Sequence, residues 1–399
     1  MMNRTLHISQ PQVSRHDGKV RLSAIVTMES KQTLWIEFDE AYAEYVCWER
    51  SDAFLLAVLP IAMRRGLDIE CEAPIGEELF YQLREYLLPA LNKGDRRMYD
   101  VEIKAMVDTM RYHGVAVGTG ISCGIDSLYS IFRAMNSEYP NLKLTHVTMF
   151  NVGAFFKKDG GQFAYQCNLA RNFACEHGLK LVVADSNFTL YDFPGKLAHH
   201  LSHVYNNAFA VFALQKLWGV YYYSSGFDFS RFSTKDNFDG DPSRYDLLFW
   251  DAVSTSQLRF YNSGGAVTRY QKTAALVDYE PASHYLNVCI KEDGQNCGEC
   301  FKCKRTLVTL DALGALDKFD GVFDIMRYKA HRHKYLFWMV RQKYLNDGDG
   351  MIDEAYDCLR GGVPRWLFVS AILSAWIDNL GGRRILGRFR TFVASKVRG

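Results

Sequence analysis

Ten consecutive residues combine glycine with small polar side chains in a pattern suited to binding phosphate. The segment 118–127 reads Gly-Thr-Gly-Ile-Ser-Cys-Gly-Ile-Asp-Ser. It follows the apolar run 115–117, which indicates a buried strand, and precedes 128–135, whose apolar spacing indicates a helix. Glycine lets the backbone approach a ligand closely, and the first turn of a helix offers N–H groups without helical partners. The pattern therefore predicts an anion-binding turn between a strand and a helix.

The residues of this turn exclude two common kinds of phosphate-binding site. No lysine stands in the turn, so the Walker pattern is absent, and the dinucleotide pattern GxGxxG is not met. What remains is S-x-G-x-D-S at 122–127, in which Ser122 and Ser127 add hydroxyl donors. Asp126 can hold Mg²⁺, which takes one or two carboxylates plus phosphate oxygens. An ordinary glycine turn without a ligand is the alternative interpretation.

A second pattern consists of Cys289 followed by Cys297, Cys300 and Cys303. Two-residue spacers turn the chain back tightly enough for neighbouring thiolates to reach one ion, and Gly298 eases the bend. Four thiolates leave no open position on zinc. The spacing therefore predicts a structural Zn²⁺ site that shapes the fold and does not activate water.

The residues beside these cysteines bear on the identity of the metal. Lys302, Lys304 and Arg305 are expected to offset the negative charge of a four-thiolate zinc site. An iron–sulfur cluster is the alternative. A ferredoxin-like run would continue to a fourth cysteine followed by proline, and Thr306-Leu307 does not provide one.

Strands and helices alternate between residues 114 and about 280, which predicts a doubly wound parallel sheet with helices on both faces. The expected strands are 115–118, 144–150, 179–184, 220–224 and 258–261, and the expected helices are 127–137, 162–177 and 196–217. Ligands bind beyond the carboxyl ends of such strands. The candidates are therefore the residues that follow each strand: 118–127, 151–153, 185–186 and 225–228. Among them, Asp185 and Asp228 could add oxygens to a Mg²⁺ ion.

The flanking segments carry no recognisable chemistry. Strands at 21–28 and 33–38, helices at 51–63 and 76–91 and a strand at 101–106 are expected before the turn, and helices at 307–319, 328–344 and 363–380 after the cysteines. The predicted division is an α+β extension over 1–110, a nucleotide domain over 111–285, a zinc segment over 286–310 and a helical extension over 311–399. Either extension could bind a second copy of the chain or a partner protein.

Composition argues against several classes of partner. The net charge of +2 over 399 residues does not favour nucleic acid as a partner, although the segment 383–398 carries six basic side chains and no acidic one. No signal peptide is visible, and the apolar run 366–377 is too short to span a bilayer, so a cytoplasmic protein is expected. His199 and His203 stand four apart, yet the glutamate of HExxH is missing, so ordinary surface or substrate-facing histidines are favoured.

The motif at 122–127 resembles the pyrophosphate loop of the N-type ATP pyrophosphatases, which split ATP between its α and β phosphates to adenylate a substrate. Its usual form is SGGxDS, so Cys123 replaces a glycine, and the substitution fits if Cys123 keeps a negative φ. With the four cysteines about 160 residues later, residues 114–310 resemble the 7-cyano-7-deazaguanine synthase family. That family has one more residue between its first two cysteines.

The resemblance implies an adenine nucleotide alpha hydrolase-like sheet and a set of site residues. ATP would contact Gly120, Ser122, Cys123, Gly124, Ile125, Asp126 and Ser127, with Asp185 and Gly226 as further contacts. The catalytic residues would be Asp126, Ser127 and Lys272, the last standing where the family has a lysine. Arg269 and Lys272 could also neutralise phosphate charge, although simple exposure is the alternative.

The implied reaction is ATP-dependent adenylation of a carboxylate, on a small molecule or a protein terminus, followed by displacement of AMP by ammonia or an amine. The substrate could be a 7-deazaguanine or belong to a bacterial defence or surface-polysaccharide pathway. Three alternatives stay open: a tRNA-thiolating or other sulfur-transfer enzyme, a sulfonucleotide reductase that uses Cys123, and a non-catalytic nucleotide-binding module.

Overall fold

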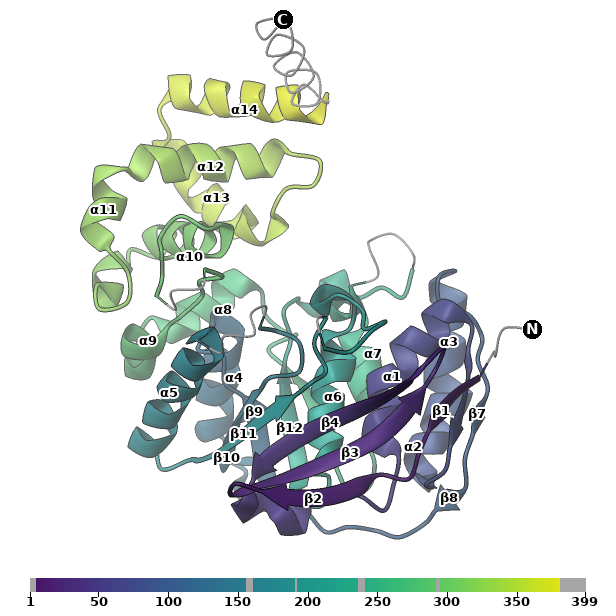
Figure 1. Cartoon of the computed structure of the whole chain (residues 1–399). Helices are drawn as coiled ribbons and strands as arrows, with labels where there is room; N and C mark the ends of the chain where they lie inside the picture. The colour runs from purple at the N-terminus through teal and green to yellow at the C-terminus, as the bar shows by residue number, and fades with distance from the viewer. Residues whose placement is uncertain (1–4, 156–160, 191, 236–240, 292–294, 381–399) are drawn as a thin grey trace, which may run out of the picture. The chain divides into compact units, whose positions relative to one another are not determined.

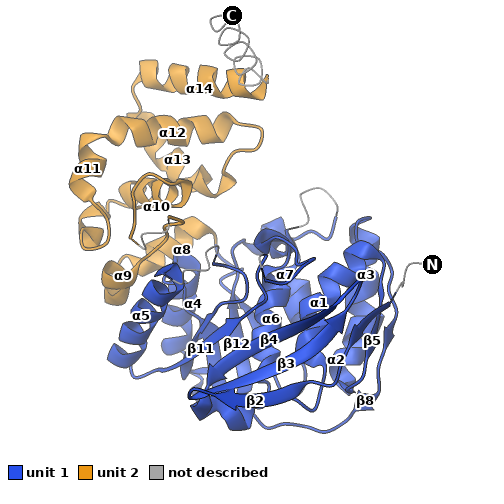
Figure 2. Cartoon of the chain, viewed as in Figure 1, with its two compact units in different colours: residues 1–267 blue, residues 268–399 orange. Residues whose placement is uncertain are grey.

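The computed structural model describes residues 5–155, 161–190, 192–235, 241–291 and 295–380. They form an α/β protein with a large mixed, mostly parallel sheet, antiparallel hairpins near the N-terminus and a helical C-terminal part (Figure 1). The chain divides into two compact units, residues 1–267 and 268–399 (Figure 2). The four segments predicted from the sequence divide the chain differently, and they remain a prediction.

Five parallel strands form one side of the large sheet, including one of its edges. They are β9 (Ala116–Gly120), β10 (His146–Phe150), β11 (Lys180–Ser186), β12 (Trp218–Ser224) and β13 (Arg259–Ser263). Their order is β13-β12-β9-β10-β11, and every neighbouring pair is parallel. All five strands expected from the sequence are present. β10 is buried along its whole length, including its polar residues His146 and Thr148.

Helices connect these strands. They are α4 (Ile125–Met135), α5 (Gly161–Glu176), α6 (His203–Ala213) and α7 (Asp246–Ala252). The helix expected over 196–217 was wrong at its start: residues His199–Leu201 form a separate 3-10 turn, and α6 begins at His203. His199 and His203 therefore do not share one continuous helical face.

The N-terminal strands continue the same sheet. They are β1 (Thr5–Ile8), β2 (Gln12–His16), β3 (Lys19–Thr27), β4 (Lys31–Asp39), β5 (Asp68–Cys71) and β7 (Ile103–Lys104). β3 and β4 form the expected antiparallel hairpin, and β4 pairs antiparallel with β11, where Phe38 lies opposite Ala184. The strands β1, β2 and β5 were missed, and the strand expected over 101–106 is reduced to β7.

Helix α1 (Asp52–Arg65) supplies much of the core beneath these strands, because almost all of its side chains are buried. It begins after Ser51 and ends at Gly66, whose φ of 63° is the left-handed conformation common at a helix end. A second helical run follows through α2 (Glu77–Gln82), a π turn (Leu83–Leu87) and α3 (Leu88–Gly94), as expected for 76–91. A two-stranded sheet pairs β6 (Ile75–Gly76) with β8 (Val107–Asp108).

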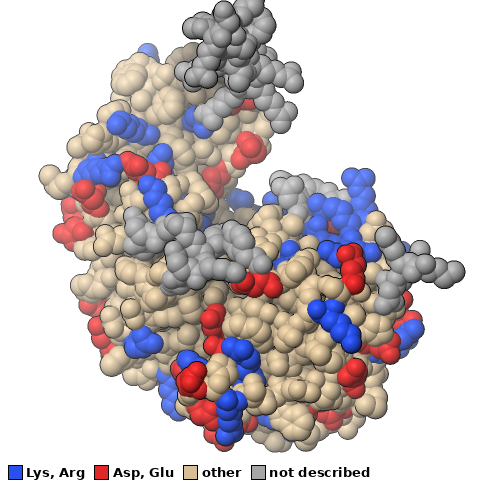
Figure 3. Space-filling view, in the orientation of Figure 1, with Lys and Arg blue, Asp and Glu red and all other residues tan. Residues whose placement is uncertain are grey.

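The second unit is helical. Its helices are α8 (Arg269–Leu276), α9 (Glu280–Tyr285), α10 (Phe301–Ala312), α11 (Ile325–Ala330), α12 (Arg332–Tyr344), α13 (Asp353–Leu359) and α14 (Arg365–Asn379). Among the described residues, no helix is long and apolar enough to cross a bilayer. The basic residues from 383 onward lie outside the described part of the chain. On the face of the first unit drawn in Figure 3, acidic and basic side chains are interspersed.

Candidate functional site

The glycine-rich turn lies where the sheet changes its winding direction. β10 and β11 lie on one side of β9, and β12 and β13 lie on the other. Connections leave in opposite directions from such a point, so the carboxyl end of the central strand opens into a crevice. β9 ends at Gly120 and α4 begins at Ile125, and no side chain caps the helix. The first N–H groups of α4 therefore have no side-chain acceptor from a cap.

Two hydroxyls meet inside the turn. The Ser122 hydroxyl lies 3.2 Å from the Ser127 hydroxyl, and the Ser122 backbone N–H donates to the same Ser127 oxygen at 3.3 Å. The Ser127 hydroxyl donates in turn to the Gly124 carbonyl at 3.0 Å. Ser127 is buried, whereas Ser122 is exposed. Ser127 thus fixes the shape of the turn, and Ser122 presents its hydroxyl to solvent or to a ligand.

Cys123 has a φ of 56°, in the left-handed region, so the condition under which it fits the place of a glycine, a negative φ, is not met. Glycine adopts this conformation without cost, which explains the glycine at the corresponding place in the motif SGGxDS. The side chain is fully buried, and burial raises the pKa of its thiol to about 12. A thiol in this state is a poor nucleophile, so the structure gives the reductase alternative no support.

A cavity of about 210 Å³ opens beside the turn. Its walls come from the ends of three parallel strands, and from the residues that follow them. The lining residues are Gly120–Ser122 and Ser127, residues 148–150, 152, 154 and 155, His199, Asn207 and residues 221–224. Whole-ligand pockets measure roughly 300–1,000 Å³, so this cavity matches the phosphate end of a nucleotide.

The structure brings Gly120, Ser122 and Ser127 to the cavity, with Asp126 in the first turn of α4. The Asp126 carboxylate is near enough to Tyr223 of the cavity wall to be among the charges that raise the pKa of that phenol. Cys123 and Ile125 are buried beneath the turn. Their contribution to a ligand would come from the backbone.

Three other predicted residues do not line the cavity. Asp185 accepts the Asn151 amide at 2.7 Å and the Ser186 backbone N–H at 2.9 Å, and burial raises its pKa. Asp228 accepts the Ser230 backbone N–H and caps the 3-10 turn Phe229–Arg231. Gly226 lies in the loop after β12 with open space around it. For Asp228 the role of a simple cap is therefore sufficient.

No protein-family model, curated protein or solved structure matches this chain. The chemistry of the site follows from its own residues.

The sequence did not predict the hydrogen-bonded group behind the cavity. Tyr223, at the end of β12, places its hydroxyl 2.7 Å from Nδ1 of His203, the first residue of α6. The other ring nitrogen of His203 lies 3.2 Å from an Asp241 carboxylate oxygen and 3.0 Å from the Ser243 hydroxyl. Because Tyr223, His203 and Asp241 come from separate elements, their spacing in the sequence carried no signal.

A buried lysine lies behind the loop that follows β10. Lys196 is 6% exposed, its Nζ lies 4.1 Å from the centre of the Phe188 ring, and no described residue forms a hydrogen bond with it. A Cβ added at Gly153 would lie 2.6 Å from its Cε atom, so only glycine leaves room for this side chain. Burial lowers the pKa of Lys196 to about 7.

Lys272 belongs to the second unit. The helix expected at this point is present, because α8 begins at Arg269 after Thr268, whose side chain forms a capping box with Gln271. Lys272 is buried, in contrast to the exposure considered as an alternative. Its role beside a nucleotide remains a prediction.

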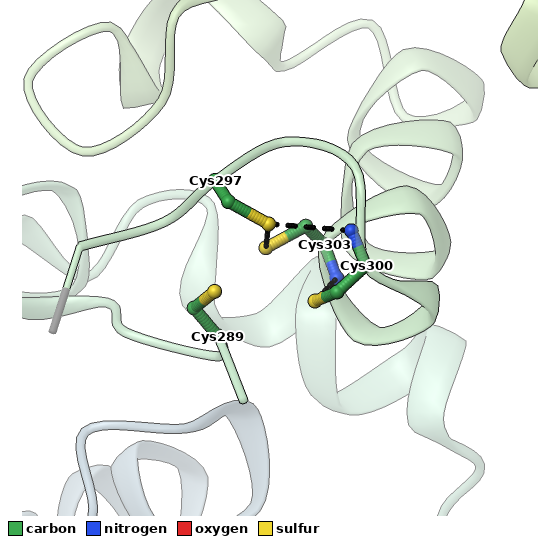
Figure 4. A group of neighbouring side chains, drawn as sticks. All are labelled: Cys289, Cys297, Cys300 and Cys303. Atoms are coloured by element: carbon green, nitrogen blue, oxygen red, sulfur yellow. Dashed lines mark hydrogen bonds between the residues drawn. The ribbon is translucent and has the colours of Figure 1, made fainter. Parts of the chain in front are cut away.

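The four cysteines come together in the second unit. Cys289, Cys297, Cys300 and Cys303 have Sγ atoms that all lie within 4.8 Å of one another. Figure 4 shows Cys300 and Cys303 at the start of α10, with the other two on the preceding chain and the sulfurs directed toward a common centre. The group can hold a metal ion such as zinc, whose bonds to sulfur are about 2.3 Å long.

Backbone N–H groups point at these sulfurs. Cys297 Sγ accepts from the N–H groups of Glu299 and Cys300 at 3.4 and 3.3 Å, and Cys300 Sγ accepts from Cys303 at 3.4 Å. Hydrogen bonds to a thiolate favour the charged form. Burial alone would raise the pKa of Cys297, but these hydrogen bonds outweigh it and lower the pKa to about 7. These N–H groups favour a thiolate at Cys297, whereas burial raises the pKa of the Cys289 and Cys303 thiols.

Asn296 holds the two halves of the cluster together and was not singled out in the sequence. Its amide nitrogen donates to the Leu286 and Val322 carbonyls at 2.8 and 3.0 Å, and its oxygen accepts the Val288 N–H at 2.9 Å. Arg305 pairs with Asp349 at 2.6 Å, and its contribution to offsetting the thiolate charge remains a prediction.

Proposed function

We propose that this chain is an ATP-dependent ligase of the N-type ATP pyrophosphatase kind, with a doubly wound, adenine nucleotide alpha hydrolase-like sheet. It adenylates a carboxylate, releases pyrophosphate, and transfers the acyl group to ammonia or an amine. The cysteine cluster holds a structural Zn²⁺. The observation that carries the proposal is the S-x-G-x-D-S turn at the carboxyl end of the central parallel strand, beside a cavity of phosphate size.

Each residue of the turn has a task in this reaction. The N–H groups at the start of α4 and the Ser122 hydroxyl bind the phosphate oxygens that leave as pyrophosphate. Asp126 binds Mg²⁺, which neutralises charge on the leaving group. A carboxylate reacts poorly with nitrogen nucleophiles until one of its oxygens is bonded to a good leaving group, here AMP. The protein contributes orientation and charge stabilisation, with about 3–4 kcal/mol from a well-placed donor.

The zinc assignment depends on the donor set. Four thiols with N–H groups directed at their sulfurs match a closed tetrahedral site. When bound, the metal joins the chain at 289 to the start of α10. A site with four protein ligands has no position for water or substrate, so its role is structural.

The direct test uses ATP labelled in its α phosphate, Mg²⁺, an ammonium salt and a carboxylated 7-deazaguanine as the first probe. The expected products are AMP and pyrophosphate. Small molecules that co-purify with an Asp126→Asn variant, identified by mass spectrometry, supply further probes. ADP and phosphate as the only nucleotide products would refute the proposal.

Variants of the turn give the first prediction. Asp126→Asn and Ser122→Ala should lower pyrophosphate release by ~100-fold or more, the loss expected for a residue that stabilises transition-state charge. Their unfolding free energy should change by less than ~1 kcal/mol, since neither side chain belongs to the core. Ser230→Ala, at the capped turn after β12, is the matched control. Full activity in both variants would remove the turn from the reaction.

A further inference from the structure

Behind the cavity, three side chains form a chain of hydrogen bonds that the phosphate chemistry does not use. Tyr223 lines the cavity and bonds to one ring nitrogen of His203, and the other nitrogen faces Asp241. Each link joins a different element: the end of β12, the start of α6 and the residue before the 3-10 turn Pro242–Arg244. The His203 and Tyr223 rings are nearly parallel, with an interplanar angle of 8° and centres 6.4 Å apart, and the hydrogen bond joins them end to end.

The direction of the hydrogen bonds follows from the charge on Asp241. Burial alone would raise the pKa of Asp241, but the hydrogen bonds from His203 and Ser243 outweigh it and hold the pKa below its ordinary value. A carboxylate only accepts, so His203 carries its proton on Nε2, and Nδ1 is the acceptor for the Tyr223 hydroxyl. The Tyr223 proton thus points away from the cavity.

We propose that Tyr223, His203 and Asp241 form a proton relay that accepts a proton from the nitrogen nucleophile, which arrives as ammonium or a primary ammonium. This inference rests on the proposed function and adds the nature of the second substrate. Ammonia is mostly protonated at neutral pH and lacks a free electron pair in that form. A ligase that uses it needs a group to take the proton.

The step balances without an added reagent. The nucleophile gives its proton to the Tyr223 oxygen as the Tyr223 proton moves to Nδ1 of His203. The nitrogen electron pair then forms the bond to the acyl carbon, and the bond from that carbon to the AMP oxygen breaks with its electrons on AMP. The second proton that the nitrogen loses to become an amide passes to the departing AMP phosphate or to water. Asp241 stabilises the imidazolium that results, as a carboxylate does beside a catalytic histidine.

The charged or titratable neighbours of the relay are Asp126 of α4, Asp246 of α7 and His199 of the preceding 3-10 turn. The neutral Ser243 hydroxyl bonds to His203. Asp126 and Asp246 are among the groups that raise the pKa of Tyr223, after burial as the main cause. Tyr223 is therefore a neutral phenol that passes a proton on and does not act as a permanent anion.

The test compares ammonium with hydroxylamine, which is mostly unprotonated at neutral pH and needs no base to attack an adenylate. In Tyr223→Phe and His203→Gln, amide formation from ammonium should fall by ~100-fold, the usual contribution of general base catalysis. Hydroxamate formation should fall far less than amide formation, and higher pH should restore amide formation. His177→Gln serves as the control. Equal losses with both nucleophiles would overturn the relay.

A second measurement separates failure of the relay from failure of the proposed function. In the full chain labelled with ¹⁵N-histidine, His203 should carry its proton on Nε2 at neutral pH and change its signals in Tyr223→Phe. A proton on Nδ1 would overturn the relay whatever the enzyme assay shows. Absence of pyrophosphate release in the unaltered protein would instead refute the proposed function.

Discussion

The two candidate sites differ in what holds their residues in place. The phosphate turn lies at the end of a buried strand, and hydrogen bonds to neighbouring strands hold it: the Ile121 N–H donates to the Thr148 carbonyl at 2.9 Å. Cys289 and Cys297 lie before α10, and Cys300 and Cys303 lie at its start. Apart from the hydrogen bonds of Asn296, the four sulfurs are where these segments converge. The turn can therefore keep its shape without a ligand, whereas a metal held by the four cysteines would add to the stability of their segment.

The largest effect should follow from breaking the cysteine cluster. Cys300→Ser should remove zinc, present at about one per chain in the unaltered protein, and make the chain sensitive to protease near residue 290. Structural zinc contributes on the order of 10 kcal/mol in small metal-dependent folds, more than most domains have in reserve. Metal analysis and limited proteolysis measure both effects.

The control for this variant lies in the same unit. Cys358 is exposed and is not part of the cluster, so Cys358→Ser should keep the metal and the normal protease pattern. Cys300→Ser should still bind ATP if the turn is supported by the sheet alone. Stoichiometric zinc in Cys300→Ser would contradict the four-thiolate site, and visible charge-transfer absorption with iron would favour the sulfur-transfer alternative.

A smaller effect concerns the free-energy cost of burying Lys196 in the first unit. The pKa of Lys196 is about 7 in the folded protein, below its ordinary value of 10.5, because the side chain is buried. Between these two pH values the unfolded chain binds more protons than the folded one, so the stability of the unaltered protein rises with pH. Lys196→Met should be more stable at pH 7, by on the order of 2–4 kcal/mol.

This advantage of Lys196→Met should shrink as the pH rises toward 10.5 and disappear above it, where lysine is neutral in both states. Urea unfolding at several pH values measures it. Lys216→Met, at a lysine paired with Glu49 at 2.6 Å, is the control and should bring no gain at pH 7. A Lys196→Met protein that is less stable than the original at pH 7 would show that Lys196 is charged and paired.

The smallest effect concerns Cys123. Glycine at this position removes the strain of a positive φ, about 1–2 kcal/mol, but it also removes a buried side chain and adds backbone freedom of about 0.5–1 kcal/mol. Cys123→Gly should therefore change the unfolding free energy by less than ~1 kcal/mol and keep full activity. Cys123→Val, branched and larger, should destabilise by ~2–3 kcal/mol. An inactive Cys123→Gly protein would indicate chemistry at the thiol.

The sequence predicted the features that depend on local patterns. The five parallel strands, the turn after β9 and the convergence of the cysteines follow from apolar runs, glycine positions and short spacings. Contacts between distant segments left no such pattern. In the sequence, Tyr223 is one residue of a predicted strand and His203 an ordinary histidine, so their hydrogen bond could not be predicted. Asp185 was a predicted Mg²⁺ ligand, and in the structure its oxygen accepts a hydrogen bond from the Asn151 amide. The positive φ of Cys123 was missed because a cysteine, unlike a glycine, does not indicate a left-handed conformation in the sequence.

The pairing of β4 with β11 has a consequence for synthesis of the chain. About 140 residues separate the end of β4 from the start of β11. At ~5–20 residues per second, the ribosome needs roughly 10–30 s to supply the partner strand, and during this time β4 is an open edge of the N-terminal hairpin. Lys31, Glu37 and Asp39 place charges on that strand. Such charges discourage pairing with other nascent chains until β11 leaves the ribosome.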